Sequence, residues 1–264
     1  MRAHIFFACM AAALLLLGCV GAPPAAGGSK TTSGAAATGQ QNQQAGTQNP
    51  AAPPPLPEDN ATASPAQQPP GKDDLLLLGR SVSQGWADYM GLEWDDNNTM
   101  SGTYQGYRIR RYEVESPPDI ATSAATGMGM FDSDIVFFKL CFVDFSGDAD
   151  DGLVEDEGYV QQVYAEAVTK RHRKLIVGNA LPQVSADSGP GLVYNHKEYD
   201  KWLDDFAKTH KDIYVLDLNG MLTDSSGALR SDYAIAPDNS HLNSDAYARI
   251  TPELMGLVAR AKSA

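Results

Sequence analysis

The chain has 264 residues, of which 33 are acidic and 20 basic, and its net charge is −13 at pH 7. No acidic residue precedes Glu58, so the negative charge belongs entirely to the part of the chain that follows. A surface this acidic repels nucleic acids and anionic lipid headgroups, and we expect neither to bind it directly.

The first 18 residues have the pattern of an export signal. Arg2 precedes a short apolar stretch at 5–17, which is too short to span a bilayer comfortably. The sequence Leu16-Leu17-Gly18-Cys19 resembles a lipobox, which implies cleavage before Cys19 and acylation of its thiol. We therefore expect a signal peptide at 1–18 and an exported, extracytoplasmic lipoprotein held on the membrane by lipid at Cys19. An ordinary secretory signal with an incidental cysteine is the alternative.

Residues 19–72 are mostly Ala, Pro, Gly, Gln, Ser and Thr. Such a segment buries too little apolar surface to offset its ordering entropy, so we expect a disordered tether. Beyond it only Cys141 remains as a thiol, within an apolar run, and we expect a small core residue rather than a disulfide partner.

Residues 73–264 alternate apolar runs with helical patterns, which indicates one α/β domain. We expect strands at 75–79, 107–114, within 134–145, at 174–181 and at 213–218, with helices from 81, from 117, at 157–172, 199–208 and 244–261. Five strands separated by helices predict a parallel sheet covered on both faces, an α/β/α sandwich.

A serine and a histidine come to the same edge of this sheet. Ser81, in Gly79-Arg-Ser-Val-Ser-Gln-Gly85, follows the first strand, and His241, three residues after Asp238, follows the fifth. Sites in such sheets form beyond the carboxyl ends of the strands. A serine, a histidine and an acid supply the nucleophile, base and orienting group of acyl transfer. A plain helix N-cap is the alternative role for Ser81, and Ser83 is a second candidate nucleophile.

These segments, with the ending Ile213-Tyr-Val-Leu-Asp-Leu and Asp238-x-x-His241-Leu-Asn, resemble the SGNH (GDSL-type) hydrolases. The resemblance covers roughly residues 74–264. It implies a five-stranded parallel flavodoxin-like sheet and hydrolysis of esters or thioesters through an acyl-enzyme. By position, Ser81 is the nucleophile, His241 the general base and Asp238 the orienting acid.

Two positions depart from that family pattern. Arg80 stands where the family has an aspartate beside the serine, and the segment Lys139-Leu-Cys-Phe-Val-Asp144 lacks the asparagine that donates to the oxyanion. Loss of one such donor costs about 2.7–4 kcal/mol of transition-state stabilisation. Lys139, Asn179 or a backbone amide are the candidates to replace it, and Asp144 is a further candidate site residue. The alternatives are a strand end for Asp144 and a turn for Asn179.

Metal and cofactor signatures are absent from the sequence. The acidic loop at 148–157 misses the EF-hand spacing, and His172, His196 and His210 lie in polar stretches that we expect to be exposed. We expect neither a metal nor an organic cofactor.

The sequence thus predicts a lipid-anchored, cell-envelope serine hydrolase that acts on an ester of a glycan or a small molecule, for instance by deacetylating a glycan. A binding module on the same scaffold without turnover, and an acyltransferase to a glycan hydroxyl, are the alternatives. The sequence does not specify the oligomeric state.

Overall fold

A seven-stranded sheet lies at the centre of residues 72–264, the part of the chain that this computed structural model describes. Its strand order is β2-β3-β4-β1-β5-β6-β7. The strands are β1 (Asp73–Gly79), β2 (Glu93–Trp94), β3 (Met100–Tyr104), β4 (Tyr107–Glu113), β5 (Ser133–Lys139), β6 (Lys174–Gly178) and β7 (Ile213–Leu216). The predicted signal peptide, Cys19 and tether lie outside the described residues.

Five of these strands form the parallel sheet that the sequence predicts. β1 pairs in parallel with β4 and β5, β5 pairs with β6, and β6 pairs with β7. In order of appearance the parallel strands are arranged 2-1-3-4-5, the flavodoxin-like order. The predicted fold is therefore confirmed.

Two antiparallel strands, β2 and β3, extend the sheet beyond the prediction. β3 joins β4 through Gln105 and Gly106, which both have positive φ, 50° and 84°. A two-residue turn of this kind matches the twist of a hairpin and brings β3 against β4. A second, two-stranded sheet contains β8 (Ala234–Ala236) and β9 (Asn239–Leu242).

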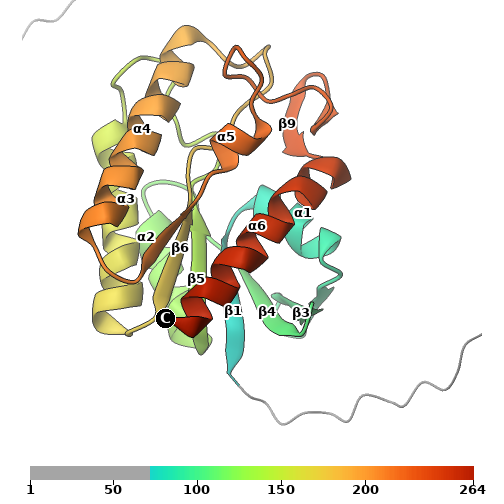
Figure 1. Cartoon of the computed structure of the whole chain (residues 1–264), viewed down its shortest axis with the longest axis vertical. Helices are drawn as coiled ribbons and strands as arrows, with labels where there is room; N and C mark the ends of the chain where they lie inside the picture. Colours follow the sequence, from blue (N-terminus) through green and yellow to red (C-terminus); the bar gives the residue numbers. More distant parts are fainter. Residues whose placement is uncertain (1–71) are drawn as a thin grey trace, which may run out of the picture. The chain divides into compact units, whose positions relative to one another are not determined.

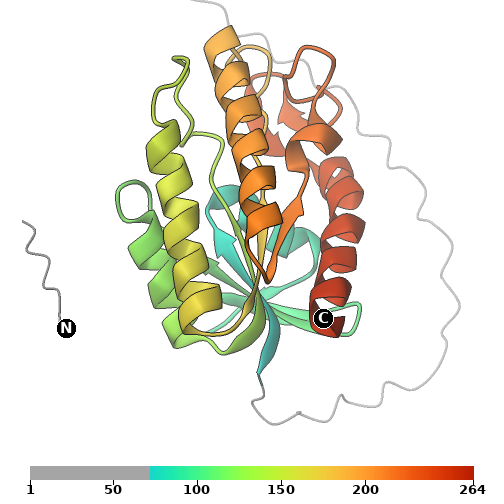
Figure 2. The same cartoon turned by 60° about the vertical axis from the view of Figure 1, so that its left-hand side comes forward.

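Helices cover both faces of the central sheet, as Figures 1 and 2 show. They are α1 (Ser81–Tyr89), α2 (Ile120–Met130), α3 (Leu153–Tyr164), α4 (Pro190–Thr209), α5 (Leu218–Leu222) and α6 (Ser244–Ser263). Alternate residues of β1 divide between the two cores: Leu75 and Leu77 pack with α1, α5 and α6, while Leu76 and Leu78 pack with α2, α3 and α4. Apolar side chains on both faces explain the uninterrupted leucine run of this strand.

Several predicted boundaries move. The strands expected at 174–181 and 213–218 end earlier, at Gly178 and Leu216. The helix expected at 157–172 begins at Leu153 and ends in a π-helical turn at Ala165–Lys170. The helix expected at 199–208 begins nine residues earlier, with Pro190 in its first turn, where the missing N–H is not needed. β5 ends at Lys139, so residues 140–145 form a loop at the carboxyl edge. No helix within 72–264 is both long and apolar enough to cross a bilayer.

Contacts between α1 and α6 determine where the two predicted catalytic segments lie. The Trp86 indole donates to Thr251 Oγ1 at 2.8 Å, and the Tyr247 hydroxyl donates to the carbonyl of Val82 at 3.0 Å. Gly85 leaves the space that the Tyr247 ring occupies. β9 leads directly into α6, whose N-cap Asn243 accepts from two backbone N–H groups. The start of α1 therefore lies against β9.

Candidate active site

Ser81 and His241 form a hydrogen-bonded pair at the carboxyl edge of the sheet. Ser81 is the first residue of α1, directly after β1, and His241 lies in β9. Their Oγ and Nε2 atoms are 2.9 Å apart. The His241 ring is half-buried and meets Phe142 edge to face, with ring centres 5.4 Å apart. Ser81 itself is exposed, so its hydroxyl is accessible from solvent.

Asn239 fixes which nitrogen of His241 carries the proton. The backbone N–H of His241 donates to Asn239 Oδ1 at 3.0 Å, and Nδ1 of the ring lies 2.8 Å from the same oxygen. A backbone N–H only donates, so the atom facing it is the amide oxygen, and an amide oxygen only accepts. Nδ1 therefore carries the proton, and Nε2 accepts from the Ser81 hydroxyl, the arrangement that a general base requires.

The structure does not give Asp238 the orienting position that the sequence predicts. Asp238 is exposed, and among the described residues no hydrogen bond joins it to His241. Asp238 lies in the turn before β9, whereas Asn239 and His241 are two residues apart within β9, so that their side chains lie on the same side of the strand. The orienting group is thus a neutral amide, one residue later than expected.

Arg80 and Asp144 connect the segment that carries Ser81 to the loop after β5. They form an ion pair in which the side chains are 16% and 2% exposed. Arg80 Nη1 also donates to Ser116 Oγ at 2.7 Å, and Asp144 Oδ2 accepts from the backbone N–H of Cys141 at 2.7 Å. Asp144 therefore acts as an internal partner of Arg80 and a brace for its own loop.

Lys139 is buried near this ion pair, and within residues 72–264 no hydrogen bond joins it to Ser81. It is 2% exposed, and its Nζ donates to the carbonyl of Leu140 at 3.2 Å. Burial lowers the pKa of Lys139, and the nearby Arg80 lowers it further. The side chain borders a small hollow together with Gly79, Arg80 and Asp144. Cys141, in the same loop, is a buried free thiol, as expected.

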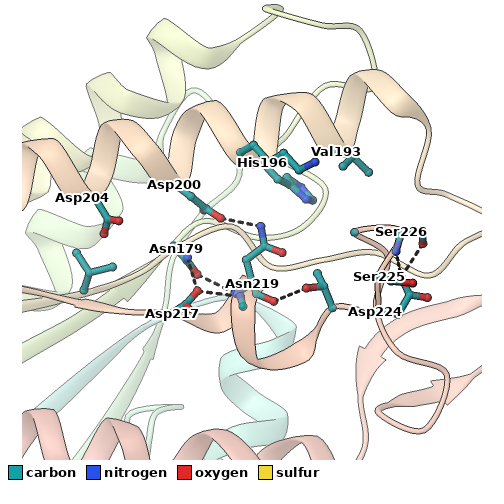
Figure 3. A pocket seen from close by; sticks show the side chains of 15 residues that line it. Asn179, Val193, His196, Asp200, Asp204, Asp217, Asn219, Asp224, Ser225 and Ser226 are labelled. Atoms are coloured by element: carbon teal, nitrogen blue, oxygen red, sulfur yellow. Dashed lines mark hydrogen bonds between the residues drawn. The ribbon is translucent and has the colours of Figure 1, made fainter.

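Asn179 lies at the ends of β6 and β7 and is held by local hydrogen bonds. Its Nδ2 donates to Asp217 Oδ1 at 2.9 Å, and its Oδ1 accepts from the backbone N–H of Asn219 at 2.9 Å. Figure 3 shows these bonds in a pocket that contains neither Ser81 nor His241. Asn179 thus connects the segments that follow β6 and β7, a role that differs from both the oxyanion contact and the turn that the sequence suggested.

The start of α1 places backbone N–H groups next to the Ser81 side chain. The first hydrogen bonds of this helix run from the N–H groups of Ser83 and Gln84 to the carbonyl of Arg80. The N–H groups of Ser81 and Val82 precede them, and they lie at the positive end of the helix. Arg111, a buried residue of β4, donates weakly to Ser83 Oγ and to the Arg80 carbonyl, at 3.4 and 3.5 Å.

Sequence reasoning missed Asn239, the Arg80–Asp144 pair and Arg111. Asn239 could have been weighed from its position next to Asp238, but no local pattern connects Arg80 with a residue 64 positions away. Within residues 72–264 there is also no group of three or more His, Cys, Asp or Glu side chains arranged to hold a metal ion.

Comparison with solved structures identifies proteins of the same architecture. A GDSL-like lipase from Bacteroides thetaiotaomicron is 14% identical, with 74% of this chain and 92% of that chain covered and a TM-score of 0.56. A member of the lipolytic protein G-D-S-L family from Veillonella parvula is 13% identical, with 71% and 98% covered and a TM-score of 0.50. No protein-family model matches the sequence, and no curated protein matches it. Residues 72–264 therefore have the fold of the GDSL-type lipolytic proteins, the fold that the resemblance in the sequence implies.

Proposed function

We propose that this protein is a serine hydrolase that cleaves carboxylic esters through an acyl-enzyme on Ser81. The main observation behind this proposal is the 2.9 Å hydrogen bond between Ser81 Oγ and His241 Nε2. The other ring nitrogen, Nδ1, is held by Asn239. The fold is shared with a GDSL-like lipase and a lipolytic G-D-S-L protein, which supports ester chemistry at this edge of the sheet.

The reaction follows from these positions. Ser81 Oγ attacks the ester carbonyl carbon while its proton passes to His241 Nε2, and the N–H groups at the start of α1 face the oxyanion. When the tetrahedral intermediate collapses, the carbon–oxygen bond to the alcohol breaks, and His241 returns the proton to the leaving alcohol. Water then attacks the acyl-serine carbonyl while His241 Nε2 accepts a proton from the water. When this second intermediate collapses, the bond between the carbonyl carbon and Ser81 Oγ breaks, His241 returns the proton to Ser81 Oγ, and the acid departs.

The exposed position of Ser81 bears on the class of substrate. A nucleophile at the surface can reach an ester that projects from a larger molecule, whereas a long acyl chain needs an apolar tunnel to cover it. We infer an acyl or acetyl ester on a glycan or a small molecule. The signal-like segment and Cys19 support a location outside the cytoplasm, on the membrane through a lipid anchor.

A fluorophosphonate probe tests the proposal, because it labels only a serine that its own base activates. In the purified full-length chain we expect labelling of Ser81 and release of p-nitrophenol from p-nitrophenyl acetate. Both should be lost in Ser81→Ala and should fall at least 100-fold in His241→Ala. Asp238→Asn is the matched control and should retain both.

Labelling that is absent from Ser81, or that persists at full rate in His241→Ala, would contradict the proposal and favour a binding module. Products analysed with and without a sugar acceptor separate hydrolysis from acyl transfer, because only the transferase forms a new sugar ester.

A further inference from the structure

A second polar pocket lies at the ends of β6 and β7, apart from Ser81 and His241. Its volume is about 470 Å³, and it is enclosed by α4, the start of α5 and the loop at 223–227. We call it the His196 pocket; it is lined by Asn179, Val193, His196, Lys197, Asp200, Asp204, Val215, Asp217, Asn219, Gly220 and residues 223–227. This volume is within the range of small-molecule sites.

The wall of the pocket is built by interlocking hydrogen bonds. Asp200 Oδ1 accepts from the backbone N–H of Ala180 at 2.9 Å, and its Oδ2 accepts from Asn219 Nδ2 at 2.6 Å. Asp217 Oδ1 accepts from Asn179 Nδ2 and from the backbone N–H of Gly220. These groups hold one another, so the pocket keeps its form without an occupant.

His196 is the unusual member of the lining. It is 2% exposed, and neither of its ring nitrogens has a hydrogen-bond partner in the described part of the chain. Figure 3 shows the ring below α4, on the side that faces Asn219 and Ser225. Burial lowers the pKa of His196 to about 4, so the imidazole is neutral at pH 7 and offers one donor and one acceptor. Buried polar atoms are almost always paired, so this ring points to a ligand.

The charge of the pocket specifies the kind of ligand. Its lining contains four aspartates and a single lysine, Lys197. Asp204, Asp217 and Asp224 are exposed at its rim, and burial raises the pKa of Asp200 to about 7. An anion is disfavoured there, and a cation is favoured. Because no metal-binding group of three ligands is present among residues 72–264, the cation must bring its own hydrogen-bond donors.

We propose that the His196 pocket binds a small protonated amine, whose N–H groups donate to the rim carboxylates and to a ring nitrogen of His196. Two sources share this chemistry: an amino sugar within a glycan, and a free polyamine. The proposal stands on the pocket alone and does not depend on catalysis at Ser81.

The proposal is tested by titrating the full-length protein with glucosamine, spermidine, N-acetylglucosamine and glucose. Binding is measured by calorimetry and by the NMR signals of the His196 ring. We expect saturable binding of at least one amine, a shift of the His196 signals, and no binding of the two neutral sugars. Binding of glucosamine alone assigns an amino sugar, binding of spermidine alone assigns a polyamine, and binding of both assigns the shared ammonium group.

The double variant Asp204→Asn/Asp224→Asn removes two exposed charges from the rim without touching the buried network. We expect it to weaken amine binding about tenfold, the effect of losing two solvent-screened ion pairs. Asp205→Asn is the matched control, because this neighbour on α4 pairs with Lys208 outside the pocket and should leave binding unchanged. Absence of amine binding, equal binding of neutral sugars, an unmoved His196 signal or an unaffected double variant would each overturn the proposal.

Discussion

Removal of the Arg80 charge is expected to destabilise the protein far more than its position near the surface suggests. In Arg80→Met the Asp144 side chain, 2% exposed, loses its ionic partner and keeps only the N–H of Cys141. A buried carboxylate left without its cation costs about 3–5 kcal/mol. Since Arg80 is 16% exposed and water can reach the space it leaves, we expect a loss near the lower limit, about 3 kcal/mol.

Removal of the Asp144 charge should lower the free energy of unfolding by less than removal of the Arg80 charge. Asp144→Asn removes the buried negative charge but leaves Arg80 with Ser116 and some access to water. We expect a loss of about 1–2 kcal/mol for this variant. In the double variant no unpaired charge is buried, so its loss should be smaller than the sum of the two single losses by about 1–2 kcal/mol.

Urea unfolding at pH 7, followed by circular dichroism, measures all three free energies of unfolding. Arg230→Met is the matched control, since Arg230 pairs with Asp232 where the two side chains are 44% and 58% exposed. An exposed pair of this kind contributes about 0–1 kcal/mol. If Arg80→Met cost no more than Arg230→Met, or if the double variant were additive, the ion pair would not be the brace described above.

Three further variants test other parts of the structure. Burial raises the pKa of Asp156 to about 7. Between about pH 4 and 7 the folded state therefore keeps a proton that the unfolded state has released. The contribution of this residue to stability falls as the pH rises through that window. Asp156→Asn should therefore match the parent at pH 4 in urea unfolding and exceed it by about 1–3 kcal/mol at pH 8; equal stability at pH 8 would refute the assignment. Asn239→Ala, which removes the acceptor for His241, should slow fluorophosphonate labelling by about 10²–10⁴-fold, whereas Asn239→Asp should equal or exceed the parent rate. Gly85→Ala would place a methyl group against the Tyr247 hydroxyl and should lower the free energy of unfolding by about 1–3 kcal/mol, despite the better helix propensity of alanine, as thermal or urea denaturation would show.

The parallel sheet and the meeting of Ser81 with His241 were predictable because they depend on patterns that the sequence displays directly. The run at 75–78 is short and is followed by Gly79, which favours a strand with both faces buried over a helix, and Ser81 comes directly after it. Once the strands are parallel, their carboxyl ends lie at one edge, which brings two segments 160 residues apart together.

The identity of the orienting group was not predictable in the same way. Spacing alone allows either Asp238 or Asn239 to reach the imidazole. The carboxylate is the natural expectation, because catalytic histidines are usually oriented by an aspartate or glutamate. The choice depends on where the turn ends and β9 begins, because residues two apart in a strand lie on the same side. β9 begins at Asn239, whose side chain faces the His241 ring, while Asp238 lies in the preceding turn and is exposed to solvent.

His196 was wrongly expected to be exposed because the start of α4 was placed too late. With the helix beginning at Pro190, Leu192, His196, Tyr199 and Leu203 recur at helical spacing on one buried face. The polar residues between them hide this periodicity when the helix is taken to begin at 199. The pocket beside His196 could not be inferred either, since it also needs the loop at 223–227, which no local pattern connects to α4.

Within residues 72–264 no charged side chain is hydrogen-bonded to Ser81 or His241, and this follows from how the nearby charges are paired. Arg80 and Asp144 neutralise each other within the brace, and the third member of the site is an amide. A carboxylate at that position would also stabilise the imidazolium formed during acyl transfer, which is why Asn239→Asp is expected to equal or exceed the parent rate. The amide oxygen of Asn239 sets the tautomer but does not add that stabilisation. Charges on the acidic surface are screened within about 8 Å at physiological salt and add little here. In the proposed mechanism Ser81 is therefore activated by the orientation of His241 through Asn239, rather than by nearby charge.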